Sequence, residues 1–353
     1  MTKHTVEEIM SQPQIWETLI KNNINLNGTT SELIKKASNH NFGFIGSGTS
    51  YYLSLSAAAM WKAVSGGQAQ AIPSADIMFY SDLYAQSGGI DSAVLISRSG
   101  TTSEILLAGE ILKKYDTNRI SLTCRAGSAL SQMGEYRYLI ENADEKSVVM
   151  TRSFTSMLLQ IQILASRFSN NSAFFDQLAS LPATGANLIK KYDGLTGEII
   201  SANNFTKFIY LGHGPHFGLA SEGMLKVKEM SVANSEAYHS LEYRHGPMSL
   251  VDKDTLIVYL LSDKTGSAET KLIGEMSALG GKSLVICETA NAEVRAKADY
   301  IVELNSGVEE NARLILSLPT LQMLAYHNAL KKGMEPDEPR NLTQVVTLED
   351  TFA

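Results

Sequence analysis

The chain has 353 residues, of which 44% are hydrophobic and 19% are charged, and its formal net charge at pH 7 is −7. This length is enough for two domains of ordinary size, or for two halves that share one interface, and the composition is typical of a globular protein with a sizeable buried core. The acidic balance disfavours a broad basic surface for nucleic acid, so an anionic ligand would need a local pocket of backbone N–H and hydroxyl groups.

Two features bear on the compartment. The two cysteines, Cys124 and Cys287, are too few and too far apart for a disulfide framework or a zinc knuckle, and each ends an apolar run typical of a buried strand. Residues 1–14 contain no apolar signal region, and no apolar stretch approaches the ~20 residues of a membrane span. We therefore expect a cytoplasmic protein whose partners include neither membrane nor nucleic acid.

Short apolar or β-branched runs alternate with longer helical patterns, which predicts parallel strands joined by crossover helices. In the first half, we expect a leading helix over 6–23, strands at 42–46, 93–97, 119–124 and 138–140, and helices over 51–62 and 103–114. Long helices over 153–180 and 185–200 should link this half to the next.

The second half repeats the alternation. We expect strands at 207–213, 255–262, 283–287 and 300–304, a helix over 217–230 and a closing helix over 312–332. The segment 333–346 contains two prolines, which predicts an extended tail over the surface.

The two halves resemble each other. Residues 44–62 align without a gap on 210–228, and residues 95–104 align on 260–269 in the same order and at similar spacing. Chance similarity between strand–glycine–helix units is the alternative, but the matched order favours internal duplication. We predict two α/β domains, 1–182 and 183–353, each a doubly wound parallel sheet between helices.

Two loops of the first half, GSGTS (46–50) and SRSGTTSE (97–104), each follow a strand and begin a helix. Ligands bind at this edge of a parallel sheet, and a helix N-terminus suits a phosphate. The hydroxyl side chains there are Thr49, Ser50, Ser97, Ser99, Thr101 and Thr102. Plain helix capping is the alternative, but two neighbouring hydroxyl loops favour a phosphate site.

Other phosphate-binding classes are disfavoured. Neither loop is a Walker loop, and GSGTS departs from the dinucleotide pattern GxGxxG. The matching second-half loop, SDKTG (262–266), has lost most hydroxyls and gained an acid. One phosphate site per chain is therefore expected.

The second half carries the candidate catalytic cluster. Glu222, Lys226 and Glu229 are spaced to share one helix face, which we expect to look towards the carboxyl end of the strand at 207–213. A solvated, salt-bridged face is the alternative. His245, in RHGP, is followed by glycine and proline and is expected on a fixed turn. No group of residues has metal-ligand spacing, so neither a metal nor another cofactor is indicated.

These motifs resemble the sugar isomerase (SIS) domain family, and in particular the isomerase half of glucosamine-6-phosphate synthase. The resemblance is carried in order by EIMSQP (8–13), SRSGTTSE (97–104), VVMTRSFTS (148–156), EGMLKVKE (222–229), EAYHSLEYRHGP (236–247) and DEPRNLTQVVTL (337–348). It covers nearly the whole chain. It implies paired flavodoxin-like domains, a homodimer or a dimer of dimers, and a sugar 6-phosphate as the ligand.

The resemblance also implies roles for individual residues. The positions that match phosphate and sugar contacts are Thr49, Ser50, Ser97, Arg98, Ser99, Thr102, Val148 and Gln344. Glu229 matches the base that moves a proton between C1 and C2, with Lys226 beside it. His245 matches the ring-opening histidine, which in the family reaches into the neighbouring protomer's site.

The departures from the family point to a stand-alone relative. No glutaminase segment precedes the matched region, so we expect no amidotransfer from glutamine. Gln344 stands where the synthase has a lysine, and Met150 replaces a substrate-contacting serine. We therefore expect an isomerase-type enzyme that acts on an amino-sugar or ketosamine 6-phosphate, with isomerisation or amine release. A plain ketose–aldose phosphate isomerase and a non-catalytic sugar-phosphate-binding module are the alternatives.

Overall fold

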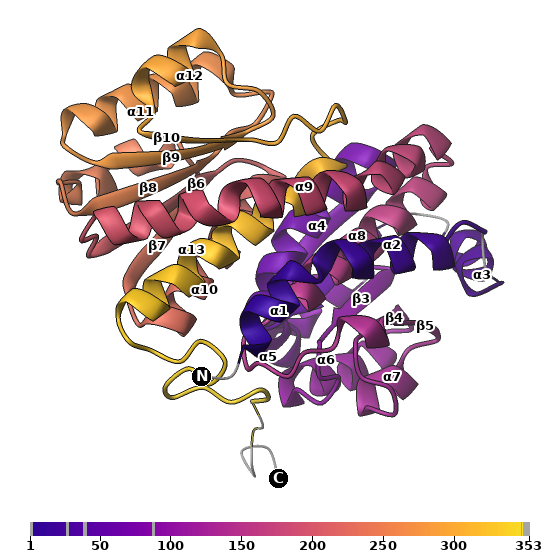
Figure 1. Ribbon diagram of the computed structural model, residues 1–353. Coiled ribbons are helices and arrows are strands. Elements are labelled where there is room, and N and C mark those ends of the chain that lie inside the picture. Colours follow the sequence, from indigo (N-terminus) through magenta and orange to yellow (C-terminus); the bar gives the residue numbers. More distant parts are fainter. Residues whose placement is uncertain (1–2, 26–27, 38–40, 87–88, 347, 349–353) are drawn as a thin grey trace. The chain divides into compact units, whose positions relative to one another are not determined.

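Two parallel sheets of five strands each organise the part of the chain that the structure describes (Figure 1). The computed structural model describes residues 3–25, 28–37, 41–86, 89–346 and 348. Strands in the middle of both sheets, such as β3 (Ser92–Ile96) and β8 (Thr255–Leu260), are buried at every position. This explains their near-continuous apolar sequence, because helices cover both faces of a parallel sheet.

The first sheet has the order β2-β1-β3-β4-β5. Its other strands are β1 (Asn41–Gly46), β2 (Gln68–Pro73), β4 (Asn118–Thr123) and β5 (Tyr136–Leu139). The helices around it are α2 (Gln12–Asn22), α3 (Gly28–Lys36), α4 (Thr49–Ser65), α5 (Ser74–Ala85), α6 (Ser103–Lys113), α7 (Ala129–Met133) and α8 (Arg152–Phe168). The rings of Phe42, Trp61 and Phe168 pack together between the sheet and α4 and α8, with centroids 4.5–5.3 Å apart.

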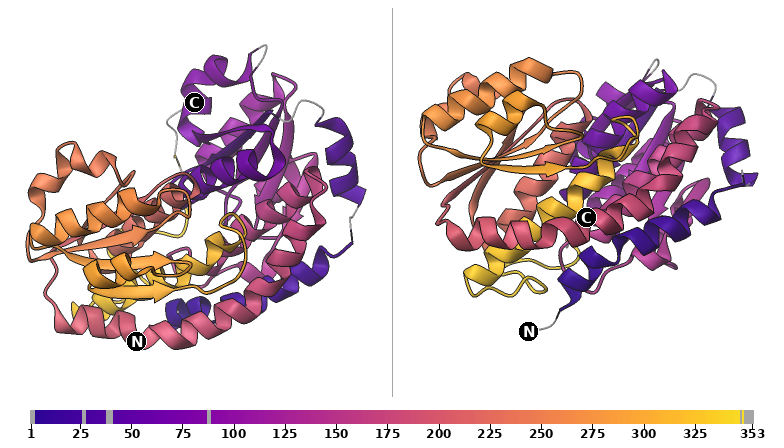
Figure 2. Two further views of the ribbon diagram at one scale, coloured as in Figure 1. Left: turned by 90° about the horizontal axis from the view of Figure 1, so that it is seen from above. Right: turned by 45° about the horizontal axis from the view of Figure 1, so that its top comes forward.

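The second sheet has the order β10-β9-β8-β6-β7, which is the same topology. Its remaining strands are β6 (Lys207–Gly212), β7 (Asn234–Tyr238), β9 (Lys282–Cys287) and β10 (Tyr300–Glu303). Helices α11 (Gly266–Ala278) and α12 (Ala292–Lys297) cover one face, while α10 (Pro215–Ser231) and α13 (Leu318–Lys331) cover the other (Figures 1 and 2). The predicted fold class, two doubly wound parallel-sheet domains, is confirmed.

Matching glycines support duplication. Gly48 (φ 55°, ψ −127°) and Gly214 (φ 53°, ψ −126°) precede α4 and α10 in the same left-handed conformation, which side chains rarely adopt. A Cβ on Gly46 or Gly212 would lie 2.5–2.6 Å from main-chain atoms of the helix that follows. Each half therefore needs glycine at both positions for its first strand-to-helix turn.

The predicted leading helix is two helices, α1 (His4–Met10) and α2, separated at Ser11. Pro13 has no N–H to donate to Ile9, and the side chain of Gln12 donates to the Ile9 carbonyl instead, at 3.0 Å. The short edge strands β2 and β7 were not predicted, because their sequences QAQAIP and NSEAY are mostly polar or small.

The linking helices also differ from expectation. The first linking helix ends before residues 169–171, where Asn170 has φ 50°. The Asn171 side chain then accepts a hydrogen bond from the N–H of Phe174 at 3.0 Å and caps the next helix. The next helix, α9 (Ser172–Ala202), continues through Pro182. Leu178 and Leu181 are fully buried beside that proline, and their packing offsets the lost hydrogen bond.

The chain forms two compact units. One contains residues 14–179 and 343–353, and the other contains residues 1–13 and 180–342. The expected division between residues 182 and 183 places residues 1–13 in the first domain and residues 343–353 in the second. In the compact units these two segments are grouped with the opposite halves. In the second unit, the N–H groups of His4 and Thr5 donate to Asp337 at 2.9 and 2.7 Å, which fixes α1 beside the end of α13.

Candidate active site

The phosphate loops predicted in the first half lie at the switch point of the first sheet. Strands β1 and β3 are neighbours, with Ile45 level with Leu95, and the chain leaves them towards α4 and α6. Open parallel sheets bind ligands beyond the carboxyl ends of such a strand pair. The two loops therefore meet at the edge where a ligand is expected.

Three hydroxyl groups converge in the loop after β3. The Ser97 hydroxyl lies 3.4 Å from that of Ser99 and 3.2 Å from that of Thr102, and the last two lie 3.5 Å apart. Gly100 has φ 64°, and a Cβ there would lie 2.1 Å from the Ser128 hydroxyl, so only glycine fits the turn. The loop thus gathers donors suited to several oxygens of one phosphate.

The loop after β1 adds a helix terminus. Thr49 and Ser50 are buried in the first turn of α4, which contains no acidic side chain. Because the first N–H groups of a helix lack intrahelical partners, this terminus carries a partial positive charge. The predicted hydroxyl residues therefore follow the carboxyl ends of two adjacent strands, as expected for an anion site.

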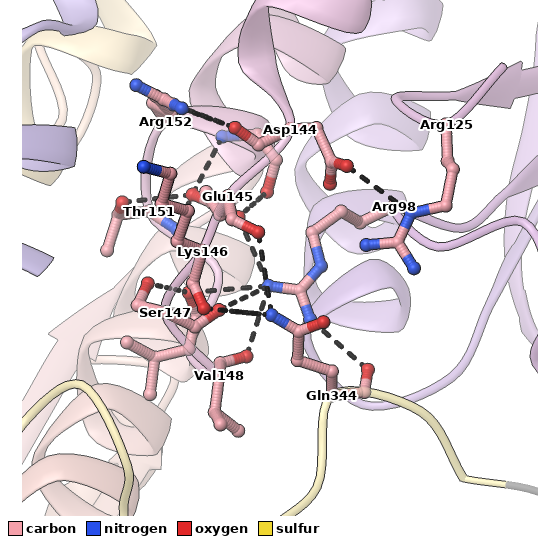
Figure 3. A network of polar contacts seen from close by, with 12 residues as sticks. Arg98, Arg125, Asp144, Glu145, Lys146, Ser147, Val148, Thr151, Arg152 and Gln344 are labelled. Carbon is pink, nitrogen blue, oxygen red and sulfur yellow. Dashed lines mark hydrogen bonds and ion pairs between the residues drawn. The ribbon is translucent and has the colours of Figure 1, made fainter. Parts of the chain in front are cut away.

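The other predicted contacts form a separate cluster. The Arg98 guanidinium lies 3.3 Å from the carboxylate of buried Glu145 and donates to the main-chain oxygens of Val148 and Gln344 (Figure 3). Glu145 was missed from the sequence. The internal repeat could have revealed Glu145, because Glu145 and Glu310 are separated by the same number of residues as the matching serines Ser97 and Ser262.

In the second half, the corresponding loop is filled by the chain's own carboxylates. Glu269 accepts hydrogen bonds from the Ser240 hydroxyl at 2.5 Å, the Ser262 N–H at 3.3 Å and the Thr265 hydroxyl. Glu310 accepts from the N–H of Asp263 at 3.1 Å. Donors that could hold an anion are therefore already occupied in this half.

The predicted cluster on α10 is buried rather than solvated. The side chains of Glu222 and Lys226 are fully buried, and that of Glu229 is 18% exposed. The Lys226 ammonium lies 3.2 Å from the Glu222 carboxylate and 2.5 Å from that of Glu229. The alternative of a salt-bridged solvent face is therefore wrong. Two carboxylates around one ammonium leave a net negative charge in the interior, which is typical of functional sites.

Two neighbouring carboxylates keep Lys226 charged. Burial lowers the pKa of Lys226, but the carboxylates of Glu222 and Glu229 outweigh burial and raise it above its ordinary value. Lys226 therefore stays protonated at neutral pH. A partly accessible carboxylate held in this way can accept a proton from a substrate carbon.

The expected orientation of Glu229 is wrong. Helix α10 begins after β6 and returns to the start of β7, so Glu229, in its last turn, lies near the amino end of that strand. The helix face spans both ends of the sheet, and sequence spacing does not reveal which residue lies at which end. A role for Glu229 therefore rests on its buried ion pair and on its position in the family motif.

His245 lies apart from this cluster. It follows the short helix η2 (Glu242–Arg244), it is exposed, and its N–H donates to the Glu242 carbonyl at 3.0 Å. Among the described residues, no contact joins its ring to Glu229. The turn predicted from RHGP is confirmed by Gly246, with φ 127°.

Among the residues placed by the structure, no group of three or more His, Cys, Asp and Glu side chains could hold a metal ion. Within those same residues, no helix combines the length and the apolarity needed to cross a bilayer.

Among curated sequences, the chain is similar to enzymes named for fructose 6-phosphate. It is 29% identical over 360 residues to glutamine–fructose-6-phosphate aminotransferase (isomerizing) of Pyrobaculum aerophilum, which covers 98% of this chain and 57% of that protein. The enzyme of the same name from Sulfurisphaera tokodaii is also 29% identical, with 98% and 54% covered. The chain thus spans a little over half the length of these relatives.

Solved structures agree. Glucosamine-6-phosphate deaminase of Thermotoga maritima is 28% identical, with a TM-score of 0.80, and the match covers 98% of this chain and 99% of that one. A putative tagatose-6-phosphate ketose/aldose isomerase of Clostridium novyi is 26% identical, with a TM-score of 0.87 over 97% and 93%. The family model for the SIS domain matches twice, at residues 37–167 and 202–332. The chain belongs to the SIS domain family, of which it carries two copies.

Proposed function

We propose that this chain is a phosphosugar isomerase-type enzyme that acts on an amino-sugar or ketosamine 6-phosphate. The observation that carries the proposal is the asymmetry between its two SIS domains. The hydroxyl groups of Ser97, Ser99 and Thr102 converge on one another in the first half. In the matching loop, Glu269 accepts hydrogen bonds from the Ser262 N–H and the Thr265 hydroxyl, and Glu310 accepts one from the Asp263 N–H. This asymmetry supports one phosphate site per chain, at residues 97–102 together with Thr49 and Ser50.

In this proposal Glu229 moves the proton. On an open-chain 2-amino aldose phosphate, its carboxylate removes the proton from C2, and the electrons move into an enolamine. Returning that proton to C1 leaves a C2 imine, and water then replaces the nitrogen, which departs as the amine. With a 1-amino ketose the roles of C1 and C2 are exchanged. Lys226, whose ammonium lies 2.5 Å from the Glu229 carboxylate, holds that side chain in place between turnovers.

His245 is assigned to ring opening, across a homodimer interface. Its exposure and its distance in sequence from the buried cluster are compatible with a group supplied to a partner's site. A cytoplasmic location is part of the same proposal.

A panel of substrates tests the function. The protein is incubated with hexosamine 6-phosphates and ketosamine 6-phosphates, and ammonia, free amino acid and sugar phosphate are measured separately. We expect release of one nitrogen product together with a nitrogen-free sugar phosphate. If the panel is converted without release of nitrogen, amine release is refuted and isomerisation remains.

A plain ketose–aldose phosphate isomerase is the second candidate. The likeness to the Clostridium novyi structure favours it, and the same carboxylate would shuttle a proton through an enediol. Conversion of a ketose 6-phosphate without nitrogen, faster than any amino sugar, would select this reaction. A non-catalytic binding module is disfavoured because the buried charges of Glu222, Lys226 and Glu229 are costly to keep without a function.

A further inference from the structure

Arg98 occupies the second position of the phosphate loop, yet its side chain is almost completely buried, at 4% exposed. One terminal nitrogen, Nη1, lies 3.3 Å from the Glu145 carboxylate and donates to the main-chain oxygens of Ser147 at 3.3 Å and Val148 at 3.1 Å. The guanidinium is therefore directed into the loop that follows β5 (Figure 3).

Glu145 fixes the guanidinium from the other side. Its carboxylate accepts from the N–H and hydroxyl of Thr151 at 2.5 and 2.9 Å, and from the N–H and hydroxyl of Ser153 at 3.1 and 2.6 Å. These groups stand at the start of α8, so the carboxylate caps that helix. A buried ion pair with this many hydrogen bonds holds one geometry.

The other nitrogen, Nη2, holds the carboxyl-terminal tail, by which we mean residues 343–346 and 348. It donates to the main-chain oxygen of Gln344 at 3.2 Å. The Gln344 side chain donates to the carbonyls of Lys146 and Ser147 at 3.0 and 3.2 Å, and the N–H of Leu348 donates to the Ser103 hydroxyl at 3.0 Å. The tail thus runs from the loop after β5 to the first residue of α6.

We propose that Arg98 is a positioning residue and not a substrate ligand: through Glu145 it fixes the loop that contains Val148, and through the Gln344 carbonyl it holds the tail beside the phosphate loop. One guanidinium then holds both segments, the loop with Val148 and the tail with Gln344, that would form the sugar end of the pocket. Because the bond to the tail reaches a main-chain oxygen, it holds the tail whichever side chain stands at position 344. The assignment of a sugar pocket here rests on the proposed function, but the attachment of the tail does not.

The second half supports this role. At the position that corresponds to Arg98 it has Asp263, which pairs with buried Arg313. The charges are reversed relative to Arg98 and Glu145. In both halves, the pair joins the residue after the first serine of the loop to the segment that follows the last strand of the sheet. This position therefore serves to tie two segments together in both halves, whatever its charge.

The test uses two variants of the whole chain. Arg98→Lys keeps the charge but cannot donate from two planar nitrogens to two segments at once. The double variant Arg98→Gln/Glu145→Gln removes both charges, so no buried ion is left unpaired. Arg125→Lys is the matched control, because Arg125 pairs with Asp144 at 3.3 Å in the same network without a bond to the tail.

Two readouts separate positioning from binding. Hydrogen exchange of a peptide covering the tail should accelerate about tenfold or more in both variants, while Arg125→Lys leaves it unchanged. Affinity for inorganic phosphate, measured by calorimetry, should stay within about threefold, because the hydroxyl groups remain in place. If turnover is found, kcat/KM for the sugar phosphate should fall in both variants.

Unchanged exchange in the tail of both variants would overturn the proposal. So would a loss of phosphate affinity greater than about tenfold, which would make Arg98 a phosphate ligand. If the wild type converts no sugar phosphate, the proposed function fails, yet tail exchange still decides the role of Arg98.

Discussion

The proposed role of Glu229 rests on its buried ion pair, because the position of this residue in the fold was predicted incorrectly from the sequence. Spacing alone placed Glu222, Lys226 and Glu229 on one helix face and left open whether solvent or protein covers it. The structure buries the face, because α10 is packed between the sheet and α13: a Cβ on Gly223 would lie 2.7 Å from the ring of Tyr210 on β6 and 3.1 Å from the Leu321 side chain on α13. Burial of this kind depends on contacts between distant segments, which no local pattern contains.

We expect Glu229→Gln to lower kcat by about 10²- to 10⁴-fold with a small change in KM, because the amide keeps the size of the side chain but cannot accept the proton. In deuterated water, the wild type should incorporate deuterium at C1 or C2 of recovered sugar phosphate and the variant should not. Glu236→Gln, on an exposed residue of β7, is the control. A variant that retains more than about a tenth of wild-type kcat would refute the assignment.

The pKa of Glu310 leads to a prediction about how stability depends on pH. Burial by itself raises the pKa of Glu310, but hydrogen bonds from His216 and Ser262 outweigh it and lower the pKa to about 2 from an ordinary 4.5. Because the folded value is the lower one, the carboxylate stabilises the protein above pH 4.5, and this contribution is lost as the pH falls towards 2.

Urea unfolding at several pH values should therefore show Glu310→Gln less stable than the wild type at pH 7, with a difference that shrinks from pH 4.5 downwards. Exposed Glu198→Gln should show no such trend. A constant difference at every pH would mean that Glu310 contributes through packing and not through its charge.

At the level of elements, the buried central strands could be predicted from the sequence, whereas the edge strands of the sheets could not. Strands β3, β4, β8 and β9 were expected within one or two residues, because buried strands have unbroken apolar sequences. The edge strand β2 contacts one neighbouring strand and carries little apolar signal. The loop after β3 was recognised by its hydroxyl groups, but the direction of Arg98 depends on Glu145, which is 47 residues away.

The phosphate loop can be tested as an element. The double variant Ser99→Ala/Thr102→Ala should raise KM for the sugar phosphate about tenfold or more with little change in kcat, because the phosphate is held equally in the ground and transition states. Ser267→Ala, at the position that corresponds to Thr102 in the second half, should leave both constants unchanged. If Ser267→Ala raised KM equally, the assignment of the phosphate site to the first half would be refuted.

For the whole molecule, we predict an obligate homodimer with composite sites. Glu229→Gln and His245→Ala should each be inactive alone. After subunit exchange, half of the dimers are mixed and each has one intact site, so about a quarter of wild-type activity should return. Mass spectrometry of differently labelled chains verifies the exchange. Mixed dimers without activity would show that both residues act within one chain.

The exchanged terminal segments have a consequence for synthesis on the ribosome. Helix α1 leaves the ribosome before both sheets, but its partners in the described structure, α13 and Asp337, are translated about 300 residues later. At ordinary translation speeds, α1 waits for tens of seconds with its apolar side uncovered. Neither compact unit is therefore complete until the last residues of this chain have been translated, and an artificial cut between residues 179 and 180 should yield two fragments that become stable only when they are produced together.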